Sequence, residues 1–201
     1  MAVSVSPRRE AVPSQTRRGF LGVCLAAAAT AAAPVFGAQT AQPAFSLKGT
    51  VYEQAGNAAR VDPVLLYAIS CVESAVDSDK RRGFIRPYPW TLRSSEGPFY
   101  GKNRADTERE LRRLLRFKPR EGVDIGLAQV NTRWHGHRVD DVFDLLDPLT
   151  NLTVAAQILN EGMKRFPNDA YRAIGSYHSG DPARAHRYAR YVIRVYTSLK
   201  Q

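Results

Sequence analysis

Apolar residues cover most of a predicted helix in VDPVLLYAISCVESAV, residues 61–76, rather than one face of it. Asp62 is a favourable N-cap and Pro63 suits the first helical position, where a missing N–H costs nothing, so we predict that the helix begins there. Its apolar side chains leave little room for a polar face, which is typical of a helix surrounded by its own domain: Leu65, Leu66, Ile69, Val72, Ala75 and Val76. One carboxylate, Glu73, lies on this apolar stripe, four residues after Ile69.

Apolar periodicity predicts further helices at 51–61, 104–117, 147–166 and 181–199, with a short one before the loop that ends at Gly180. The helix at 104–117 places leucines against Arg112, Arg113 and Arg116, so its basic side is expected to face solvent. Between the helices, residues 90–92 and 98–100 flank the turn-rich RSSEG and predict a small hairpin, with Pro98 restricting it to a sheet edge. We therefore predict a mainly α single domain with a small β-hairpin insertion.

The first part of the chain has a different composition. Paired arginines in TRRGFL (16–21) precede a weakly apolar run and resemble the twin-arginine export signal of bacteria. A transmembrane anchor is the alternative, since the run from Phe20 to Ala38 nearly reaches the roughly 20 residues that span a bilayer. Its alanine and glycine content favours a cleaved signal. We predict an export signal at 1–37, a flexible leader at 38–48, a domain at 49–201 with an insertion at 78–124, and a periplasmic protein with no stable membrane insertion after processing.

Charge and cysteine content bound the partners and the fold. Without residues 1–37 the chain has 25 basic and 18 acidic side chains, a balance of +7. An exported basic protein is expected to meet anionic cell wall or lipid rather than nucleic acid, although a solvated basic face with no specific partner is the alternative. Only Cys71 remains in that part, so no internal disulfide can form and packing alone must stabilise the fold.

Glu73 is the first candidate for chemistry. A carboxylic acid among aliphatic side chains has its ionised form disfavoured by desolvation, so it can stay protonated near neutral pH. Such an acid can donate a proton to a glycosidic oxygen. The alternative is that Glu73 lies at the helix margin, paired with an arginine such as Arg81 or Arg82.

Four sequence blocks decide between these interpretations. The helix with Glu73 is followed by GLAQVN (126–131), DPLTNL (147–152) and AIGSYHSG (173–180). In this order they resemble the blocks of SLT-type lytic transglycosylases, goose-lysozyme-like enzymes that cleave peptidoglycan. The resemblance covers roughly residues 50–198 and implies a lysozyme-like fold, peptidoglycan strands as the partner and no cofactor.

The resemblance also implies roles for individual residues. Glu73 matches the single catalytic acid, Ser74 its accompanying serine near the sugar, and Tyr177 the tyrosine that contacts the acid or the sugar. Two positions depart from the family pattern: Ala128 stands in place of a methionine, and His178 in place of an asparagine. The expected substrate-binding set is Ser74, Gly126, Leu127, Ala128, Gln129, Asn131, Tyr177 and His178.

The family reaction needs one carboxylate, which protonates the glycosidic oxygen and then accepts the proton of the C6 hydroxyl, giving a 1,6-anhydro end. A hydrolase of the same fold would need a second carboxylate to activate water. Asp124 is the best candidate for that second carboxylate, followed by Asp77 and Asp79, but the pattern favours a role for Asp124 as the cap of the turn before GLAQ (126–129). A non-catalytic wall-binding component of a secretion apparatus is the third possibility.

The remaining candidates are aromatic residues and histidines. Trp90, Tyr100, Trp134 and Tyr177 lie outside obvious helix cores and are candidate platforms for sugar stacking. His135 and His137 lie two residues apart without a nearby cysteine, which is weak evidence for zinc, so we predict no metal.

Two segments point to a narrower branch of the family. The insertion with Trp90 and the segment RWHGHR (133–138) resemble the branch encoded with conjugative and integrative elements. That likeness implies a conjugation or type IV secretion apparatus as a partner. The basic helix at 104–118 is a candidate surface for docking to such a partner or to the anionic wall.

Overall fold

The computed structural model describes residues 45–76, 85–117 and 122–201. The predicted export signal and most of the predicted leader lie outside these residues, as does the start of the predicted insertion. Among the described residues, no helix combines the length and apolar composition needed to cross a membrane.

Helices make up most of the described chain, and three of the long ones begin with an aspartate cap, as predicted at Asp62. Asp62, Asp147 and Asp181 each accept a hydrogen bond from a backbone N–H of the first turn and precede a proline at the first helical position. The helices are α1 (Val51–Ala59), α2 (Pro63–Ser74), α4 (Arg104–Phe117), α5 (Thr132–His135), α6 (Pro148–Arg165), α7 (Ala170–Gly175) and α8 (Pro182–Leu199), with 3₁₀ turns at Gly136–Arg138 and Val142–Leu146.

A small antiparallel sheet accompanies the helices. The predicted hairpin is confirmed as β1 (Thr91–Ser94) and β2 (Gly97–Tyr100), with Pro98 on the edge strand opposite Arg93. The sequence patterns did not indicate its two further strands, β3 (Asp124–Ile125) and β4 (Val130–Asn131), which extend the sheet in the order β2-β1-β3-β4. The mainly α fold with a small hairpin is therefore confirmed, and the sheet is larger than expected.

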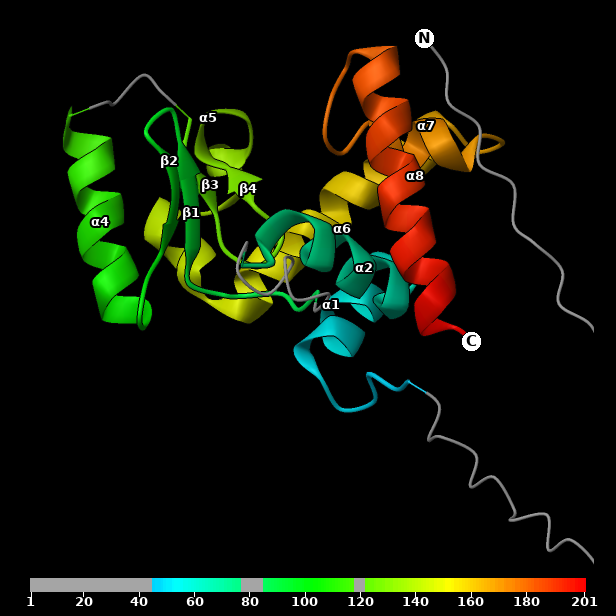
Figure 1. Cartoon of the computed structure of the whole chain (residues 1–201), viewed down its shortest axis with the longest axis horizontal. Coiled ribbons are helices and arrows are strands. Elements are labelled where there is room, and N and C mark those ends of the chain that lie inside the picture. Colours follow the sequence, from blue (N-terminus) through cyan, green and yellow to red (C-terminus); the bar gives the residue numbers. More distant parts are fainter. Residues whose placement is uncertain (1–44, 77–84, 118–121) are drawn as a thin grey trace, which may run out of the picture. The chain divides into compact units, whose positions relative to one another are not determined.

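Helix α2 is the centre of the helical part, as its apolar composition predicted. Leu66 and Ile69 are fully buried, and α2 packs against α1 and α8, while α6 packs against α1 and α7. Figure 1 shows α4 and the strands at one end of the domain and α8 at the other, with α2 and α6 between them. The last turn of α2 is thus held between the helical part and the sheet.

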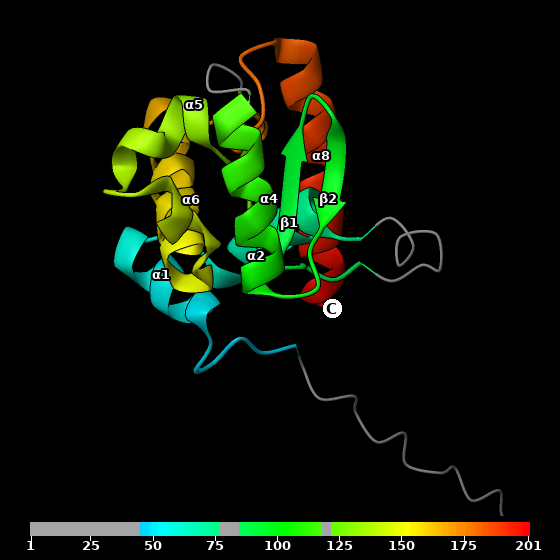
Figure 2. The same cartoon turned by 90° about the vertical axis from the view of Figure 1, so that its left-hand side faces the viewer.

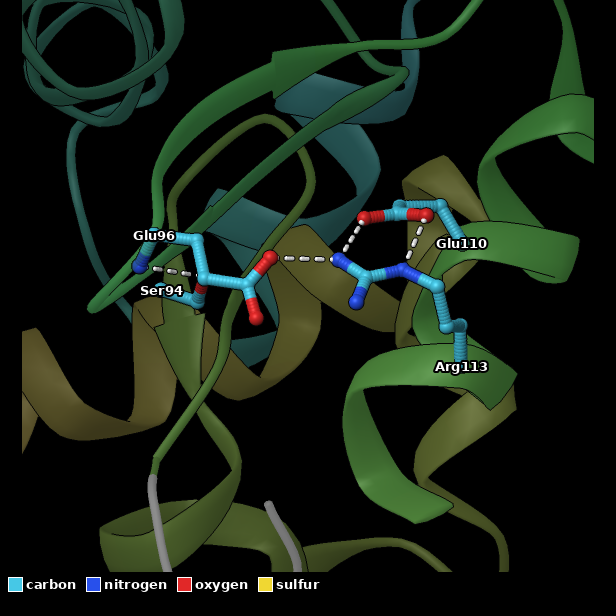
Figure 3. Close-up of polar contacts among 4 residues, drawn as sticks. All are labelled: Ser94, Glu96, Glu110 and Arg113. Atoms are coloured by element: carbon cyan, nitrogen blue, oxygen red, sulfur yellow. Dashed lines mark hydrogen bonds and ion pairs between the residues drawn. The ribbon is translucent and has the colours of Figure 1, made fainter. Parts of the chain in front are cut away.

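Helix α4 packs against β1 of the hairpin (Figure 2), and Arg112, Arg113 and Arg116 on it are exposed. Leu111 and Leu114 are buried, whereas Phe117, expected on the same apolar side, is 68% exposed at the end of the helix. The arginines are largely paired with acids. Figure 3 shows Arg113 between Glu110 of α4 and Glu96 of the hairpin turn, with a nitrogen–oxygen distance of 2.6 Å to each.

Candidate active site

Glu73 lies in the last turn of α2, next to a cavity of about 440 Å³. The helix stops after Ser74 because Ala75 adopts an extended conformation (ψ 135°). Glu73 itself is half-buried. The lining residues come from most of the domain and define what we call the Glu73 cavity: Val72, Glu73, Arg93, Asp124, Gln129, Val130, Asn131, Trp134, His135, Ile158, Tyr177, His178 and Tyr188.

The structure brings five of the predicted site residues together in this cavity: Glu73, Gln129, Asn131, Tyr177 and His178. Ser74, Gly126, Leu127 and Ala128 do not line it. Ser74 is fully buried, where its hydroxyl donates to the carbonyl of Ser70 (3.0 Å) and accepts from the backbone N–H of Tyr88 (3.1 Å). This geometry gives Ser74 a structural role, tying α2 to the segment before β1, and does not support contact with a sugar.

Gly126, Leu127 and Ala128 instead shape the turn between β3 and β4. Gly126 has φ +78°, and a Cβ there would lie 2.6 Å from the Nδ2 atom of Asn151, so only glycine fits. Gln129 also has a positive φ of 48°. Its Nε2 atom donates to the carbonyls of Thr91 (3.1 Å) and Gly126 (2.9 Å), which holds the turn against β1.

Asn151 of α6 fixes this turn from behind. Its Oδ1 atom accepts from the backbone N–H of Ala128 (2.9 Å), while Nδ2 donates to the carbonyls of Ile125 (2.8 Å) and Leu145 (3.0 Å). Asn151 is 1% exposed, so each of these bonds replaces a lost contact with water. Asn151 lies in the sequence block at 147–152, but its positioning role is visible only from its hydrogen-bond partners in the folded protein.

Aromatic side chains face Glu73 across the cavity. Tyr177, which follows α7, donates its hydroxyl proton to the carbonyl of Ala128 at 2.7 Å. Burial raises the pKa of Tyr177 well above its usual value, and the negative charges of Glu73 and Asp124 raise it further. Burial, followed by the charge of Glu73, raises the pKa of Tyr188 in the same way. The hydroxyls of Tyr177 and Tyr188 are therefore both protonated at neutral pH. His178 stacks on the Tyr188 ring at 4.7 Å.

Two polar groups that line the cavity lack a hydrogen-bond partner in the described part of the chain, and a third is uncharged at neutral pH. The Oε1 atom of Gln129 and the hydroxyl of Tyr188 are buried and have no hydrogen bond of good geometry among the described residues. Desolvation lowers the pKa of His178, and the charge of Arg184 lowers it further, so its imidazole is neutral near pH 7. The cavity therefore offers donors and acceptors that suit hydroxyl and amide groups.

Asp124 is a second carboxyl group in the Glu73 cavity. Burial raises its pKa, and a hydrogen bond of 2.7 Å from Asn131 Nδ2 opposes that rise, together with the charges of Arg93 and His178. Asn131 in turn caps α5 through Oδ1. The other two carboxylates considered for this role, Asp77 and Asp79, lie outside the described residues.

Among the candidate aromatic platforms, Trp134 and Tyr177 line the Glu73 cavity, and Trp90 and Tyr100 do not. Trp134 is 65% exposed although it lies beside a cavity. The cavity also includes Arg93 and Tyr188, which the sequence did not single out. Tyr188 belongs to the buried face of α8, and its position in that pattern indicates packing alone. Arg93 reaches the cavity through the pairing of β1 with β3, which a sequence does not display.

The histidines do not form a metal centre with other described residues. Desolvation lowers the pKa of His135, and the nearby Arg138 lowers it further. Within residues 45–76, 85–117 and 122–201, no group of three or more histidine, cysteine or acidic side chains is placed to hold a metal ion.

Comparison with known families gives a match that covers most of the chain. The model of the transglycosylase SLT domain matches residues 50–192. The chain belongs to this family. The SLT domain family consists of lytic transglycosylases that act on peptidoglycan in the periplasm, so the predicted family and its substrate are confirmed. No curated protein matches the chain. The matched region contains the whole Glu73 cavity.

Proposed function

We propose that the protein cleaves the β-1,4 bond between N-acetylmuramic acid and N-acetylglucosamine and leaves a 1,6-anhydro-muramic end. Glu73 serves as the single general acid and base. One observation carries this proposal: Glu73 lies in the last turn of a buried helix and lines a cavity whose other polar residues come from the strands and their β3–β4 turn, α5, the segment after α7, and α8.

Glu73 begins the reaction protonated in this scheme. The C-terminal end of a helix disfavours negative charge, and α2 has no basic residue in its last turn. Half-burial acts in the same direction. These two features support a neutral acid that waits for the glycosidic oxygen.

Two proton transfers complete the cycle. Glu73 donates its proton to the bridging oxygen, the bond to the muramic anomeric carbon breaks, and N-acetylglucosamine leaves with that proton. The resulting carboxylate then accepts the proton of the C6 hydroxyl as its oxygen bonds to the anomeric carbon. Glu73 is regenerated and no water is consumed. The buried hydroxyl of Tyr188, whose pKa responds to burial and to Glu73, is placed to donate a hydrogen bond to the transient carboxylate.

The sugar-binding roles follow from the cavity lining. Gln129 Oε1 is a buried acceptor for a sugar N–H or O–H group. His178 and Asn131 offer further polar atoms, and the exposed ring of Trp134 offers a flat apolar face to a sugar ring. Tyr177 positions the cavity wall through the hydrogen bond that its hydroxyl donates to the carbonyl of Ala128.

A muramidase that hydrolyses the same bond is the second candidate, and Asp124 is the observation that favours it. Asp124 lines the same cavity as Glu73, so it is available to activate water. Its carboxylate already accepts a hydrogen bond from Asn131, which occupies one of its oxygens and opposes use as a base, whereas the rise of its pKa on burial favours that use.

Digestion of purified sacculi by the protein tests the proposal. Mass spectrometry of the released fragments should show anhydro ends, and these should fall by about 10²- to 10⁴-fold in Glu73→Gln, the range that a general acid supplies. Glu108→Gln is the matched control, because that acid is on α4 in an exposed pair with Arg112. Reducing ends would establish the hydrolase, and binding without release would establish a wall-binding protein.

The cellular setting is part of the proposal. We place the protein in the periplasm after export through the segment at 1–37, and propose that it serves a conjugation or secretion apparatus. The family's substrate supports the location. Fusion of residues 1–48 to a reporter, with and without Arg17→Lys and Arg18→Lys, measures the export step directly.

A further inference from the structure

A second cavity, of about 560 Å³, lies where α6, α7 and α8 meet. Its charged and aromatic lining residues are Arg165, Phe166, Asp169, Tyr171, Arg172 and His186. None of its lining residues lines the Glu73 cavity. We call it the arginine cavity. Its size is within the range of about 300–1,000 Å³ that small-molecule sites occupy.

The basic groups of the arginine cavity are held in place but not neutralised. The guanidinium carbons of Arg165 and Arg172 lie 5.2 and 4.4 Å from the centre of the Phe166 ring. Neither guanidinium has an ion-pair partner among the described residues. Asp169 is the carboxylate in the lining, and it accepts the backbone N–H of Arg172 as the cap of α7 (2.9 Å). The arginines therefore retain their donors for an anionic ligand.

An aromatic pair supplies the rest of the wall. The rings of Tyr171 and His186 stack at 5.3 Å and with an angle of 20°. A ligand for this cavity thus combines a carboxylate with a short apolar or amide portion, as a small peptide does.

The surface next to the arginine cavity has the same sign of charge. Helix α8 contains no acidic residue, and Arg187, Arg190 and Arg194 are exposed without an ion pair among the described residues. On α4, by contrast, Arg109, Arg112 and Arg113 each pair with an acid at 2.6–3.0 Å. The field of α8 therefore attracts anions to the cavity, whereas α4 is largely neutralised by its own acids.

The position of the arginine cavity connects it to the substrate. Tyr177 and His178 line the Glu73 cavity, while Ser176, Ser179 and Gly180 of the same segment line the arginine cavity. The short segment between α7 and α8 thus contributes residues to both cavities. Peptidoglycan carries peptide stems with free carboxylates on the same muramic sugars whose bond the family cleaves.

We propose that the arginine cavity binds a carboxylate of a peptidoglycan peptide stem, with Arg165 and Arg172 as its donors. This site rests on the proposed function, because the stem belongs to the strand held in the Glu73 cavity. The stem crosses the 176–180 segment and adds affinity without taking part in the reaction.

Titration calorimetry with a synthetic stem tetrapeptide tests the site. The protein should bind the peptide with free carboxylates and bind the fully amidated peptide at least about tenfold more weakly, since each lost charge-assisted contact is worth about that factor. Arg165→Gln and Arg172→Gln should each weaken binding about tenfold. Arg109→Gln on α4, whose side chain is 72% exposed, is the matched control and should bind normally.

Activity assays separate this site from the catalytic proposal. The double arginine variant should lose activity on sacculi but release anhydro ends normally from peptide-free glycan strands. Equal binding of the free and amidated peptides, or a loss of activity on peptide-free strands, would overturn the site. Capture of phosphatidylglycerol vesicles in place of the peptide, abolished by the same variants, would also overturn it. Peptide binding by a protein that releases no anhydro ends would support the site and refute the proposed reaction.

Discussion

The hydroxyl of Tyr177 donates a hydrogen bond of 2.7 Å to the carbonyl oxygen of Ala128, 49 residues earlier in the chain. Ala128 is fully buried in the turn between β3 and β4, and Tyr177 lines the Glu73 cavity. The bond therefore joins the helical side of the cavity to its strand side. Neither wall holds its position independently of the other.

Tyr177→Phe removes the donor and leaves the buried carbonyl of Ala128 without it. We expect the free energy of unfolding to fall by about 1–3 kcal/mol, the cost of an unsatisfied buried acceptor. Activity should fall as well, because the cavity wall is no longer fixed. Urea unfolding and release of anhydro ends measure the two effects. Tyr191→Phe, a control on α8 where the side chain is 63% exposed and lines neither cavity, should change neither quantity.

Gly126→Ala tests the turn itself. The new residue would carry φ +78° and place its Cβ 2.6 Å from Asn151 Nδ2. Left-handed backbone costs a non-glycine residue about 1–2 kcal/mol, and the clash adds to this. Gly49→Ala is the matched control, since Gly49 has φ +75° and nothing within 4 Å of its Cβ position. Chemical denaturation measures the loss of stability in each variant. Equal losses would show that the Asn151 side chain moves away from the new Cβ without a measurable free-energy cost.

The sequence predicted the elements whose signals are local. Cap and proline pairs such as Asp62-Pro63 and Asp147-Pro148 set helix starts, and the structure begins α2 and α6 there. The hairpin of β1 and β2 followed from a turn between aromatic runs. Strands β3 and β4 have two residues each, which is too short to show an alternation of apolar and polar residues. They form because β3 pairs with β1.

The site was predictable in part for the same reason. Glu73 stood out as a charge on an apolar stripe, and family blocks pointed to Gln129, Asn131, Tyr177 and His178. The burial of Ser74 and Ala128 could not be predicted from the sequence, because both residues contact partners that are distant in the chain, Tyr88 and Tyr177 respectively. Arg93 was missed because only the pairing of β1 with β3 brings it to Asp124.

Trp134→Ala tests sugar stacking at the rim of the cavity. The side chain is 65% exposed, so the free energy of unfolding should change by no more than about 0.5 kcal/mol. Affinity for glycan strands should fall by about threefold to tenfold, the worth of an aromatic contact. Phe117→Ala, which removes a 68% exposed ring from α4, is the control for binding. An unchanged dissociation constant for Trp134→Ala would exclude the stacking role.

Asp124→Asn separates the two reactions by chemistry and by pH. Burial raises the pKa of Asp124 in the folded protein above its unfolded value, so the stability linked to this carboxyl is full below the unfolded pKa and is lost as the pH rises through the raised pKa. The amide keeps an oxygen for the hydrogen bond from Asn131 and removes that loss. The variant should therefore be more stable than the parent at about pH 7, and the difference should vanish below about pH 3.5, where both states of the parent are protonated.

Product analysis completes the test of Asp124. A lytic transglycosylase needs only Glu73, so Asp124→Asn should keep its anhydro products within a few-fold of the parent. A hydrolase would lose its base and its reducing ends together. Asp140→Asn is the control, because that carboxylate is exposed and outside the cavity. Higher stability with intact anhydro release would mean that Asp124 is kept for a reason other than proton transfer, with its hydrogen bond to Asn131 as the structural candidate.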